Sequence, residues 1–161
     1  MSDTKLTGKV AVITGASRGL GKAMALALAG AGAKLALVSR NRTDLEAVAQ
    51  ECAKLGASAE VFIADVTSEE QVALLAEDVR SRCGAAQILI NNAGINVRKP
   101  ATDFTLAEWR SVLDTNLTSV FLLCRVFVPQ MKGRGYGRII NMTSIMSHIA
   151  LPQRTAYCAS K

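Results

Sequence analysis

The hydrophobic residues of this chain follow two alternating patterns. Short, nearly continuous apolar runs alternate with longer stretches in which apolar residues recur at every third or fourth position. Continuous runs are typical of strands buried on both faces of a sheet, whereas the recurring pattern is typical of helices with one buried face. The runs that predict strands are KVAVIT (9–14), KLALVS (34–39), AEVFIAD (59–65), AQILI (86–90) and GRIINMTS (137–144).

The stretches between these runs carry signals for the start and end of helices. Helices are expected at about 18–31, from 43, from 67 or 68 to 82, over 105–131, and from about 154. Thr43 can cap the second helix, with Glu46 completing a capping box. Because strands that alternate with helices pair in parallel through right-handed crossovers, the sequence predicts an α/β fold, a doubly wound parallel sheet with helices on both faces. No linker or repeat interrupts residues 1–161, which predicts one domain.

Composition and charge narrow the possible partners. The chain has 161 residues, half of them apolar, and a formal charge of +6 from basic residues that are scattered. Neither a long basic helix nor an aromatic-interleaved RNA motif is present, so no nucleic-acid partner is predicted. No apolar run reaches the roughly 18 residues needed to cross a bilayer, and the first residues show no targeting signal. The expected location is therefore the cytoplasm, without a membrane partner.

The cysteines and the single histidine do not predict a metal site or a disulfide framework. Cys52, Cys83, Cys124 and Cys158 form no C-x-x-C pair, and His148 has no second ligand at metal-binding spacing. Reduced thiols also agree with a cytosolic protein.

A glycine-rich turn joins the first predicted strand to the first predicted helix. It reads TGASRGLG (14–21), a Gly-x-x-x-Gly-x-Gly spacing in the strand–turn–helix context that a dinucleotide fingerprint requires. Gly15 permits the tight turn, while Gly19 and Gly21 allow close approach of the backbone to a ligand and of the helix to the strand. The N-terminus of the helix can then bind a pyrophosphate. A plain turn is the alternative interpretation of this loop taken alone.

The residues after the second predicted strand bear on the choice of cofactor. Proteins that bind NAD commonly place a carboxylate there for the ribose 2′-OH, whereas this chain has Ser39, Arg40, Asn41 and Arg42. Arginine binds a 2′-phosphate through charge-assisted hydrogen bonds, and Arg18 in the glycine-rich turn adds a second positive charge. The sequence therefore predicts NADP(H) in preference to NAD(H). The alternative is that these arginines are merely solvated.

Two more predicted strands end in polar motifs. Asp65 ends the third strand, and NNAG (91–94) follows the fourth. Ligands of doubly wound sheets bind at the carboxyl edge of the strands, so Asn92 is expected beside the crevice, with Gly94 permitting close backbone approach. Taken alone, Asp65 is also consistent with a capped turn, and NNAG with a simple turn.

The stretch TAYCASK places Tyr157 and Lys161 one helical turn apart. A free tyrosine has a pKa near ~10, and a nearby ammonium group stabilises the phenolate and lowers that pKa. Tyr157 is then suited to act as general acid or base on a carbonyl or alcohol oxygen. Ser144, just past the last predicted strand, could bond the same oxygen, and Asn116 lies in the long predicted helix. A Tyr-x-x-x-Lys pair by itself is a common surface pattern.

Together these motifs resemble the short-chain dehydrogenase/reductase family. They follow the family's order and approximate spacing from TGASRGLG through NNAG to YCASK. The resemblance implies a Rossmann-type fold and hydride transfer between a nicotinamide cofactor and a carbonyl or secondary alcohol. It implies that Tyr157 is the acid/base, that Lys161 lowers its pKa and binds the nicotinamide ribose, that Ser144 orients the substrate carbonyl, and that Asn116 holds a water in a proton relay.

The motifs and the resemblance together define the expected cofactor site, in which Asp65 and the backbone of the next residue contact adenine. The expected cofactor-binding residues are Gly15, Ser17, Arg18, Gly19, Leu20, Gly21, Arg40, Asp65, Val66, Asn92, Ala93, Gly94, Tyr157 and Lys161. One catalytic assignment stays open, because the family usually has a second serine where this chain has Thr143. Ser147 is therefore a rival of Ser144, although the spacing to Tyr157 favours Ser144.

The substrate is less well defined than the cofactor. The stretches NAGINVRKP and DTNLTSVF are similar to those of gluconate dehydrogenases and of 3-oxoacyl carrier-protein reductases, which implies a small carbonyl or alcohol such as a sugar acid or a 3-oxoacyl group. Arg98, Lys99, His148 and Arg154 lie on loops expected to border the pocket, where they could bind a carboxylate or phosphate. Ordinary surface charge is the alternative interpretation.

The resemblance also implies that the domain continues beyond the Tyr/Lys helix with two more strands and a loop that closes over substrate. Residues 1–161 would then be a C-terminally incomplete domain of a longer parent, which is expected to be a homo-oligomer, a dimer or a tetramer. The fifth strand is expected to form an exposed edge of the sheet. Two interpretations follow: an NADP-dependent oxidoreductase, or a nucleotide-binding fragment or interaction module without turnover.

Overall fold

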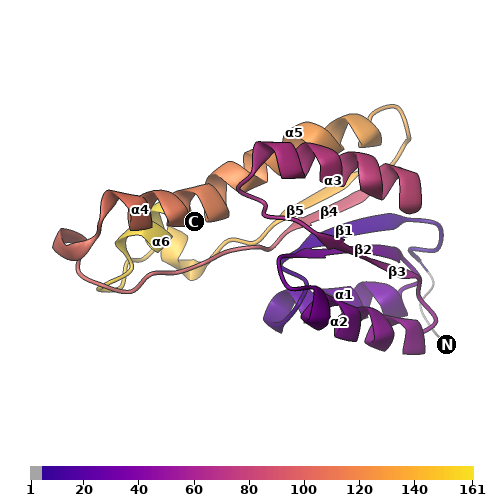
Figure 1. The fold of residues 1–161 in the computed structure, drawn as a ribbon, viewed down its shortest axis with the longest axis horizontal. Helices are drawn as coiled ribbons and strands as arrows, with labels where there is room; N and C mark the ends of the chain where they lie inside the picture. The colour runs from indigo at the N-terminus through magenta and orange to yellow at the C-terminus, as the bar shows by residue number, and fades with distance from the viewer. Residues whose placement is uncertain (1–4) are drawn as a thin grey trace.

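The computed structural model of the chain describes residues 5–161, which contain one parallel sheet with the strand order β3-β2-β1-β4-β5 (Figure 1). The strands are β1 (Val10–Thr14), β2 (Lys34–Ser39), β3 (Ala59–Ile63), β4 (Ile88–Asn91) and β5 (Arg138–Asn141). Every pairing is parallel, and the order reverses between β1 and β4. This confirms the doubly wound α/β fold.

Helices cover both faces of the sheet (Figure 1). The α-helices are α1 (Gly19–Gly30), α2 (Arg42–Lys54), α3 (Glu69–Arg82), α4 (Leu106–Leu113), α5 (Ser119–Met131) and α6 (Thr155–Ser160). Alternate residues of β1 point to opposite cores: Val12 belongs to the cluster that contains α3 and α5, and Ile13 to the cluster that contains α1 and α2. Burial on both faces explains why the central strands are continuous apolar runs.

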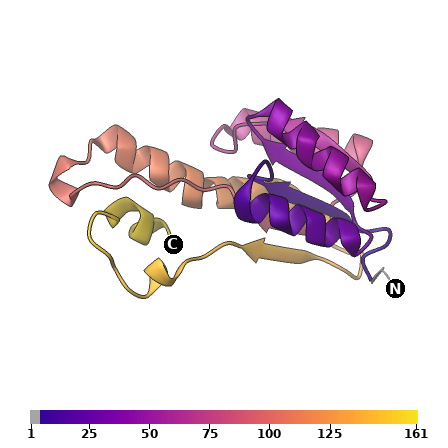
Figure 2. The same ribbon diagram turned by 90° about the horizontal axis from the view of Figure 1, so that it is seen from below.

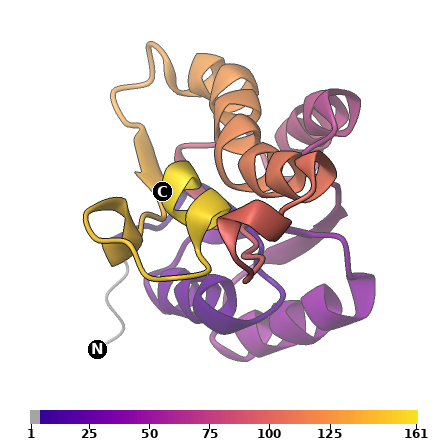
Figure 3. The ribbon, with the colours of Figure 1, turned by 90° about the vertical axis from the view of Figure 1, so that its left-hand side faces the viewer.

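The segments that carry the candidate catalytic residues extend beyond the carboxyl edge of the sheet. They are the loop after β4, with a 3₁₀ turn at Ala101–Asp103 (η1), then α4, and then the segment after β5 with a 3₁₀ turn at Ile145–Ser147 (η3) and α6. Figure 2 shows this arm in profile, and Figure 3 views it end-on. Helix α6 packs against α4 and η3, so two segments far apart in sequence meet in the arm.

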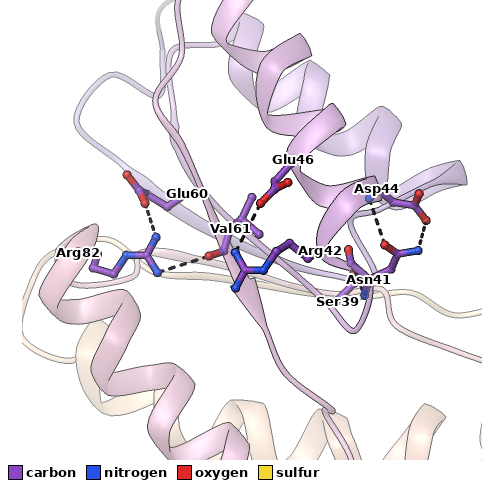
Figure 4. Close-up of polar contacts among 8 residues, drawn as sticks. All are labelled: Ser39, Asn41, Arg42, Asp44, Glu46, Glu60, Val61 and Arg82. Carbon is purple, nitrogen blue, oxygen red and sulfur yellow. Dashed lines mark hydrogen bonds and ion pairs between the residues drawn. The ribbon is translucent and has the colours of Figure 1, made fainter.

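The predicted start of the second helix was wrong. Asn41, not Thr43, is the N-cap of α2, because its side-chain oxygen accepts a hydrogen bond from the backbone N–H of Asp44 (3.2 Å). Glu46 forms no capping box and instead pairs with Arg42 (3.5 Å), as Figure 4 shows. Asparagine caps helices at least as well as threonine, and it lies two residues earlier in the chain.

The predicted helix over 105–131 has the expected ends but an unexpected centre. Thr105 and Glu108 form a reciprocal capping box at its start. Between α4 and α5 the chain forms a π-helical turn, Asp114–Thr118 (η2). Such turns are rare and often lie at functional sites, and this one contains Asn116.

The expectation that no stretch could cross a bilayer was wrong by length and composition. The helical stretch Leu106–Met131 has a mean hydropathy of 1.4 in its most apolar window, of which 33% is buried. This is weak support for a membrane span, because core helices pass the same test. Leu122, Leu123 and Phe127 from this stretch belong to the core beside α3.

Strand β5 forms one edge of the sheet, as expected. All four of its residues are exposed, including Ile139 at 42% and Ile140 at 44%. An exposed apolar edge of this kind invites pairing with another strand.

Candidate active site

The glycine-rich turn after β1 folds tightly at the N-terminus of α1. Gly15 and Gly19 have φ values of +63° and +55°, a region that favours glycine. A Cβ atom on Gly21 would lie 2.1 Å from the carbonyl oxygen of Gly15, so only glycine fits where the helix closes on the turn. A Cβ atom on Gly19 would meet nothing within 4 Å, so this part of the backbone is open to a ligand.

Hydrogen bonds join this turn to the NNAG motif after β4. The fully buried hydroxyl oxygen of Thr14 accepts from the N–H groups of Asn92 and Ala93, both at 3.1 Å. The side-chain Nδ2 of Asn92 donates to the carbonyl oxygens of Thr14 (2.9 Å) and Gly15 (3.2 Å). The two motifs therefore form one unit across the point where the strand order reverses. The role of Thr14 was not predicted, although the residue stands at the start of the motif.

A cavity of about 410 Å³ lies at this carboxyl edge of the sheet. The predicted residues that line it are Gly15, Ser17, Arg18, Leu20, Gly21, Arg40, Asp65, Val66, Asn92, Ala93 and Gly94. Further lining residues that were not predicted are Ser39, Asn41, Asp44, Ala64, Ile95 and Thr115. The lining thus brings together four segments that were predicted separately from sequence. It does not include the catalytic candidates, which lie in the arm.

The cavity contains charges of both signs. Arg40 Nη1 lies 3.8 Å from Asp65 Oδ2. The pKa of Asp65 is lowered, chiefly by the hydrogen bond from the backbone N–H of Thr67 and also by its hydroxyl and by Arg40. Asp65 thus forms the capped turn that sequence left as an alternative, and it lines the cavity as well. Arg42 is directed away, toward Val61 at the edge of β3 (Figure 4).

Lys161 and Tyr157 lie together in the arm. Lys161 Nζ is 5.8 Å from the centre of the Tyr157 ring and donates a hydrogen bond to the main-chain oxygen of Met142 (2.6 Å). Burial lowers the pKa of Lys161. The bond to Met142 ties this lysine to the end of β5.

Asn116 links the π-helical turn to two other segments. Its Oδ1 accepts from the N–H of Ile95 (2.8 Å), and its Nδ2 donates to the carbonyl oxygen of Ile95 (2.9 Å). The second Nδ2 hydrogen goes to Ser160 Oγ (2.9 Å) in α6. Asn116 thus joins the loop after NNAG to the helix that carries Tyr157. Ser160 was missed, because a serine inside YCASK carries no signal of its own.

Ser144 and its rival Ser147 differ in their surroundings. Ser144 is partly buried and caps the 3₁₀ turn η3, where its Oγ accepts from the N–H of Met146 (3.2 Å). Ser147 is exposed, and its hydroxyl donates to the carbonyl oxygen of Ser144 (2.6 Å). The turn packs against α6 and so brings this segment next to the helix of Tyr157.

The basic residues proposed near the substrate are not equivalent. Lys99 is held in an ion pair with Glu108 (2.7 Å) and also donates to the carbonyl oxygen of Asp103 (3.2 Å). This pairing lowers the pKa of Glu108 to about 2, with the hydrogen bond from Lys99 as the largest cause. Lys99 therefore stabilises the arm, whereas Arg98 and His148 are exposed.

Comparison with known proteins identifies the family. Residues 9–161 match the family described as short chain dehydrogenase. The chain belongs to this family. A D-threitol dehydrogenase of Mycolicibacterium smegmatis is 39% identical over 99% of this chain and 61% of the relative. A gluconate 5-dehydrogenase of Gluconobacter oxydans is 35% identical over 97% and 61%.

Solved structures agree with this assignment. A metagenomic short-chain oxidoreductase in complex with NADP superimposes with a TM-score of 0.94 at 37% identity, covering 98% of this chain and 72% of that one. This short-chain dehydrogenase chain spans between 55% and 63% of the length of the first curated relatives that it matches.

Proposed function

We propose that this short-chain dehydrogenase chain carries the nucleotide site and the catalytic residues of an NADP(H)-dependent oxidoreductase. Its reaction is hydride transfer between nicotinamide and a small carbonyl compound or secondary alcohol, such as a sugar acid or a 3-oxoacyl group. The observation that carries the proposal is the cavity at the carboxyl edge, where the glycine-rich turn, Arg40, Asp65 and NNAG meet. Relatives named as dehydrogenases of threitol and gluconate support a polyol or sugar-acid substrate.

The residues present fit a dinucleotide. The turn places helix N–H groups and the positive end of α1 at the cavity, which suits a pyrophosphate. Gly19 leaves open space on its ligand side, and Gly21 lets the turn close. Arg18 and Arg40 both line the cavity and supply charge for a 2′-phosphate. The relative solved with NADP supports the same preference.

The arm supplies the proton chemistry. The nicotinamide, when bound, supplies or accepts the hydride at the substrate carbon. Tyr157 donates its phenolic proton to the carbonyl oxygen in reduction and takes it back in oxidation, while the charge of Lys161 favours the phenolate. Ser144 donates a hydrogen bond to the same oxygen. Both Nδ2 hydrogens of Asn116 are committed to Ile95 and Ser160, so a relay water would have to bind Asn116 through an oxygen atom.

The proposal is tested by titrating the purified chain with NADPH and with NADH, following nicotinamide fluorescence and thermal melting. NADPH is expected to bind more tightly and to raise the melting temperature further. Replacing Arg40 by serine should reduce the preference for NADPH by about tenfold or more, the scale of a charge-assisted hydrogen bond. Arg42→Ser is the matched control, because Arg42 points away from the cavity. Tighter binding of NADH by the unmodified chain would contradict the cofactor assignment.

A second candidate function is nucleotide binding without turnover. It is favoured by the exposure of β5 on both faces and by the partial coverage of the relatives. Assays with gluconate or D-threitol plus NADP⁺, and with a 3-oxoacyl thioester plus NADPH, separate the two. Binding without turnover of any probe would favour the second candidate.

We further propose that residues 1–161 form one C-terminally incomplete domain and that the longer parent is a cytoplasmic dimer or tetramer. The all-exposed edge strand and the shares of the relatives that are matched support this proposal. Gel filtration of the chain alone, compared with a version extended to the length of its relatives, measures the oligomeric state directly. A stable dimer of residues 1–161 would show that the oligomer does not require further residues.

A further inference from the structure

The last turn of α6 contains a buried serine that the proposed reaction does not use. Ser160 is 6% exposed, and its hydroxyl donates to the main-chain oxygen of Tyr157 (2.8 Å). The same hydroxyl oxygen accepts from Nδ2 of Asn116 (2.9 Å), which is itself only 4% exposed. Ser160 therefore bonds both to the residue that carries the phenol and to the π-helical turn.

The direction of these bonds follows from the chemistry of the groups. The Tyr157 carbonyl can only accept, so the single hydrogen of the Ser160 hydroxyl goes to it, and Ser160 then accepts from Asn116. This places Nδ2 of Asn116 toward α6 and Oδ1 toward the N–H of Ile95. Ile95 supplies the matching acceptor for the second Nδ2 hydrogen. Ser160 thus fixes the orientation of the carboxamide that joins three segments.

The Tyr157 carbonyl depends on this serine. In a regular α-helix it would accept from the backbone N–H four residues later, that of Lys161. Here the N–H of Lys161 donates to the carbonyl oxygen of Cys158 instead (3.3 Å). The Ser160 hydroxyl takes its place, in the back-bonding pattern that serine adopts in helices. Because a helix as short as α6 is marginal by itself, these side-chain bonds contribute strongly to its position.

We propose that Ser160 is a positioning residue for the reaction. It fixes α6 to the π-helical turn and to the loop after NNAG, and so holds Tyr157 and Lys161 in the orientation that proton transfer requires. What is positioned rests on the proposed oxidoreductase function, whereas the bonds themselves do not. The bond from Lys161 Nζ to Met142 anchors the other side of the same helix.

The test compares Ser160→Ala with Ser119→Ala. Ser119 is 1% exposed, and its hydroxyl donates to the carbonyl oxygen of Thr115 (2.6 Å) one turn earlier in the same helical stretch. Both changes remove one buried hydroxyl that back-bonds within a helix, but only the Ser160 hydroxyl has a printed bond to a different element. The first readout, which needs no turnover, is the pH dependence of Lys161 acylation, measured by competitive labelling and mass spectrometry. The second is kcat for NADP⁺-dependent oxidation of gluconate or D-threitol.

Ser160→Ala is expected to raise the midpoint pH of Lys161 labelling, because a loosened α6 exposes the ammonium group to water. It should also lower kcat by about 10- to 100-fold, the scale of a small displacement of a catalytic group, with little change in NADPH affinity. Ser160→Thr keeps the hydroxyl and should restore both values. Ser119→Ala should leave both near those of the unmodified chain.

Several outcomes overturn the proposal. One is a Ser160→Ala chain with an unchanged labelling profile and kcat, and another is an equal loss in Ser119→Ala. If Ser160→Ala gives no cooperative melt, Ser160→Cys decides, since it keeps the shape but is a weak donor and acceptor. Lack of turnover by the unmodified chain would refute the proposed function, whereas the labelling profiles would still decide the role of Ser160.

Discussion

The two halves of the candidate site are held in place by different means. The nucleotide half is formed by the ends of β1, β2 and β4, whose residues are buried in the core of the sheet. The catalytic half lies in the arm beyond the sheet, where short segments are joined by side-chain hydrogen bonds of Asn116, Ser160 and Lys161 (Figures 1 and 2). Damage to the first half should therefore reduce folding and binding together. Damage to the second should reduce chemistry with binding largely intact.

The largest effect is expected from Gly21→Ala in the nucleotide half. The new Cβ atom would lie 2.1 Å from the carbonyl oxygen of Gly15, a backbone atom that cannot move without distorting the turn. Overpacking of this severity should cost about 3 kcal/mol or more and abolish NADPH binding. Urea unfolding and fluorescence titration measure the two losses.

Gly30→Ala is the matched control for that change. Gly30 ends the same helix, and a Cβ atom there would meet nothing within 4 Å. Removing a helical glycine at an open position should stabilise the chain by up to about 1 kcal/mol. Equal stability of the two alanine variants would show that the turn is not as tightly constrained as the 2.1 Å contact implies.

In the catalytic half, Tyr157→Phe removes only the phenolic oxygen. We expect kcat to fall by about 10²- to 10⁴-fold, the usual contribution of a general acid or base, with a far smaller change in NADPH affinity. Tyr136→Phe is the control, because the ring of Tyr136 lies between Lys9 and Arg138, away from α6. Full turnover by Tyr157→Phe would remove this residue from the mechanism.

Thr14→Val tests the bond that joins the two motifs of the nucleotide half. Valine keeps the shape but cannot accept the hydrogen bonds from the backbone N–H groups of Asn92 and Ala93. Leaving buried donors unpaired should cost about 2 kcal/mol and weaken NADPH binding. Thr67→Val, the same change at an exposed position, should stay within about 0.5 kcal/mol in urea unfolding. Similar costs at both positions would contradict a special role for Thr14.

The same division explains what could be predicted from sequence. The strands and the cavity lining were predictable, because continuous apolar runs and glycine spacing report local backbone requirements that the core enforces. The predicted residues of four separate motifs do meet in one cavity. Helix starts were less predictable, since Asn41 and Thr43 are both good caps and their competition is decided by the exit from β2.

The arm was harder to predict because its contacts join residues that are distant in sequence. Nothing in DTNLTS signals a π-helical turn, and the bond between Asn116 and Ser160 joins residues 44 positions apart. Lys99 reads as a free cation near the substrate, yet its pairing with Glu108 depends on how the loop after NNAG returns to α4. In each case a tertiary contact, not a local preference, decides the role of the side chain.

The smallest effect is expected at this ion pair, which holds the loop to the arm. The pKa of Glu108 is lowered from an ordinary 4.5 to about 2, so its ionised form stabilises the folded chain. The contribution is fully present above about pH 4.5 and is lost as the pH falls from there toward 2. Because Glu108 is exposed to solvent, screening keeps the contribution small.

Glu108→Gln isolates that contribution, since glutamine can still complete the capping box with Thr105. The unmodified chain should melt at a slightly higher temperature than Glu108→Gln near pH 7, and the difference should shrink as the pH approaches 2. Other carboxylates titrate in both proteins and cancel in the comparison. A difference that persists unchanged to low pH would mean that Glu108 acts through its cap rather than through Lys99. In that case a loss of the charge on Lys99, as in Lys99→Gln, should leave the melting temperature unaltered.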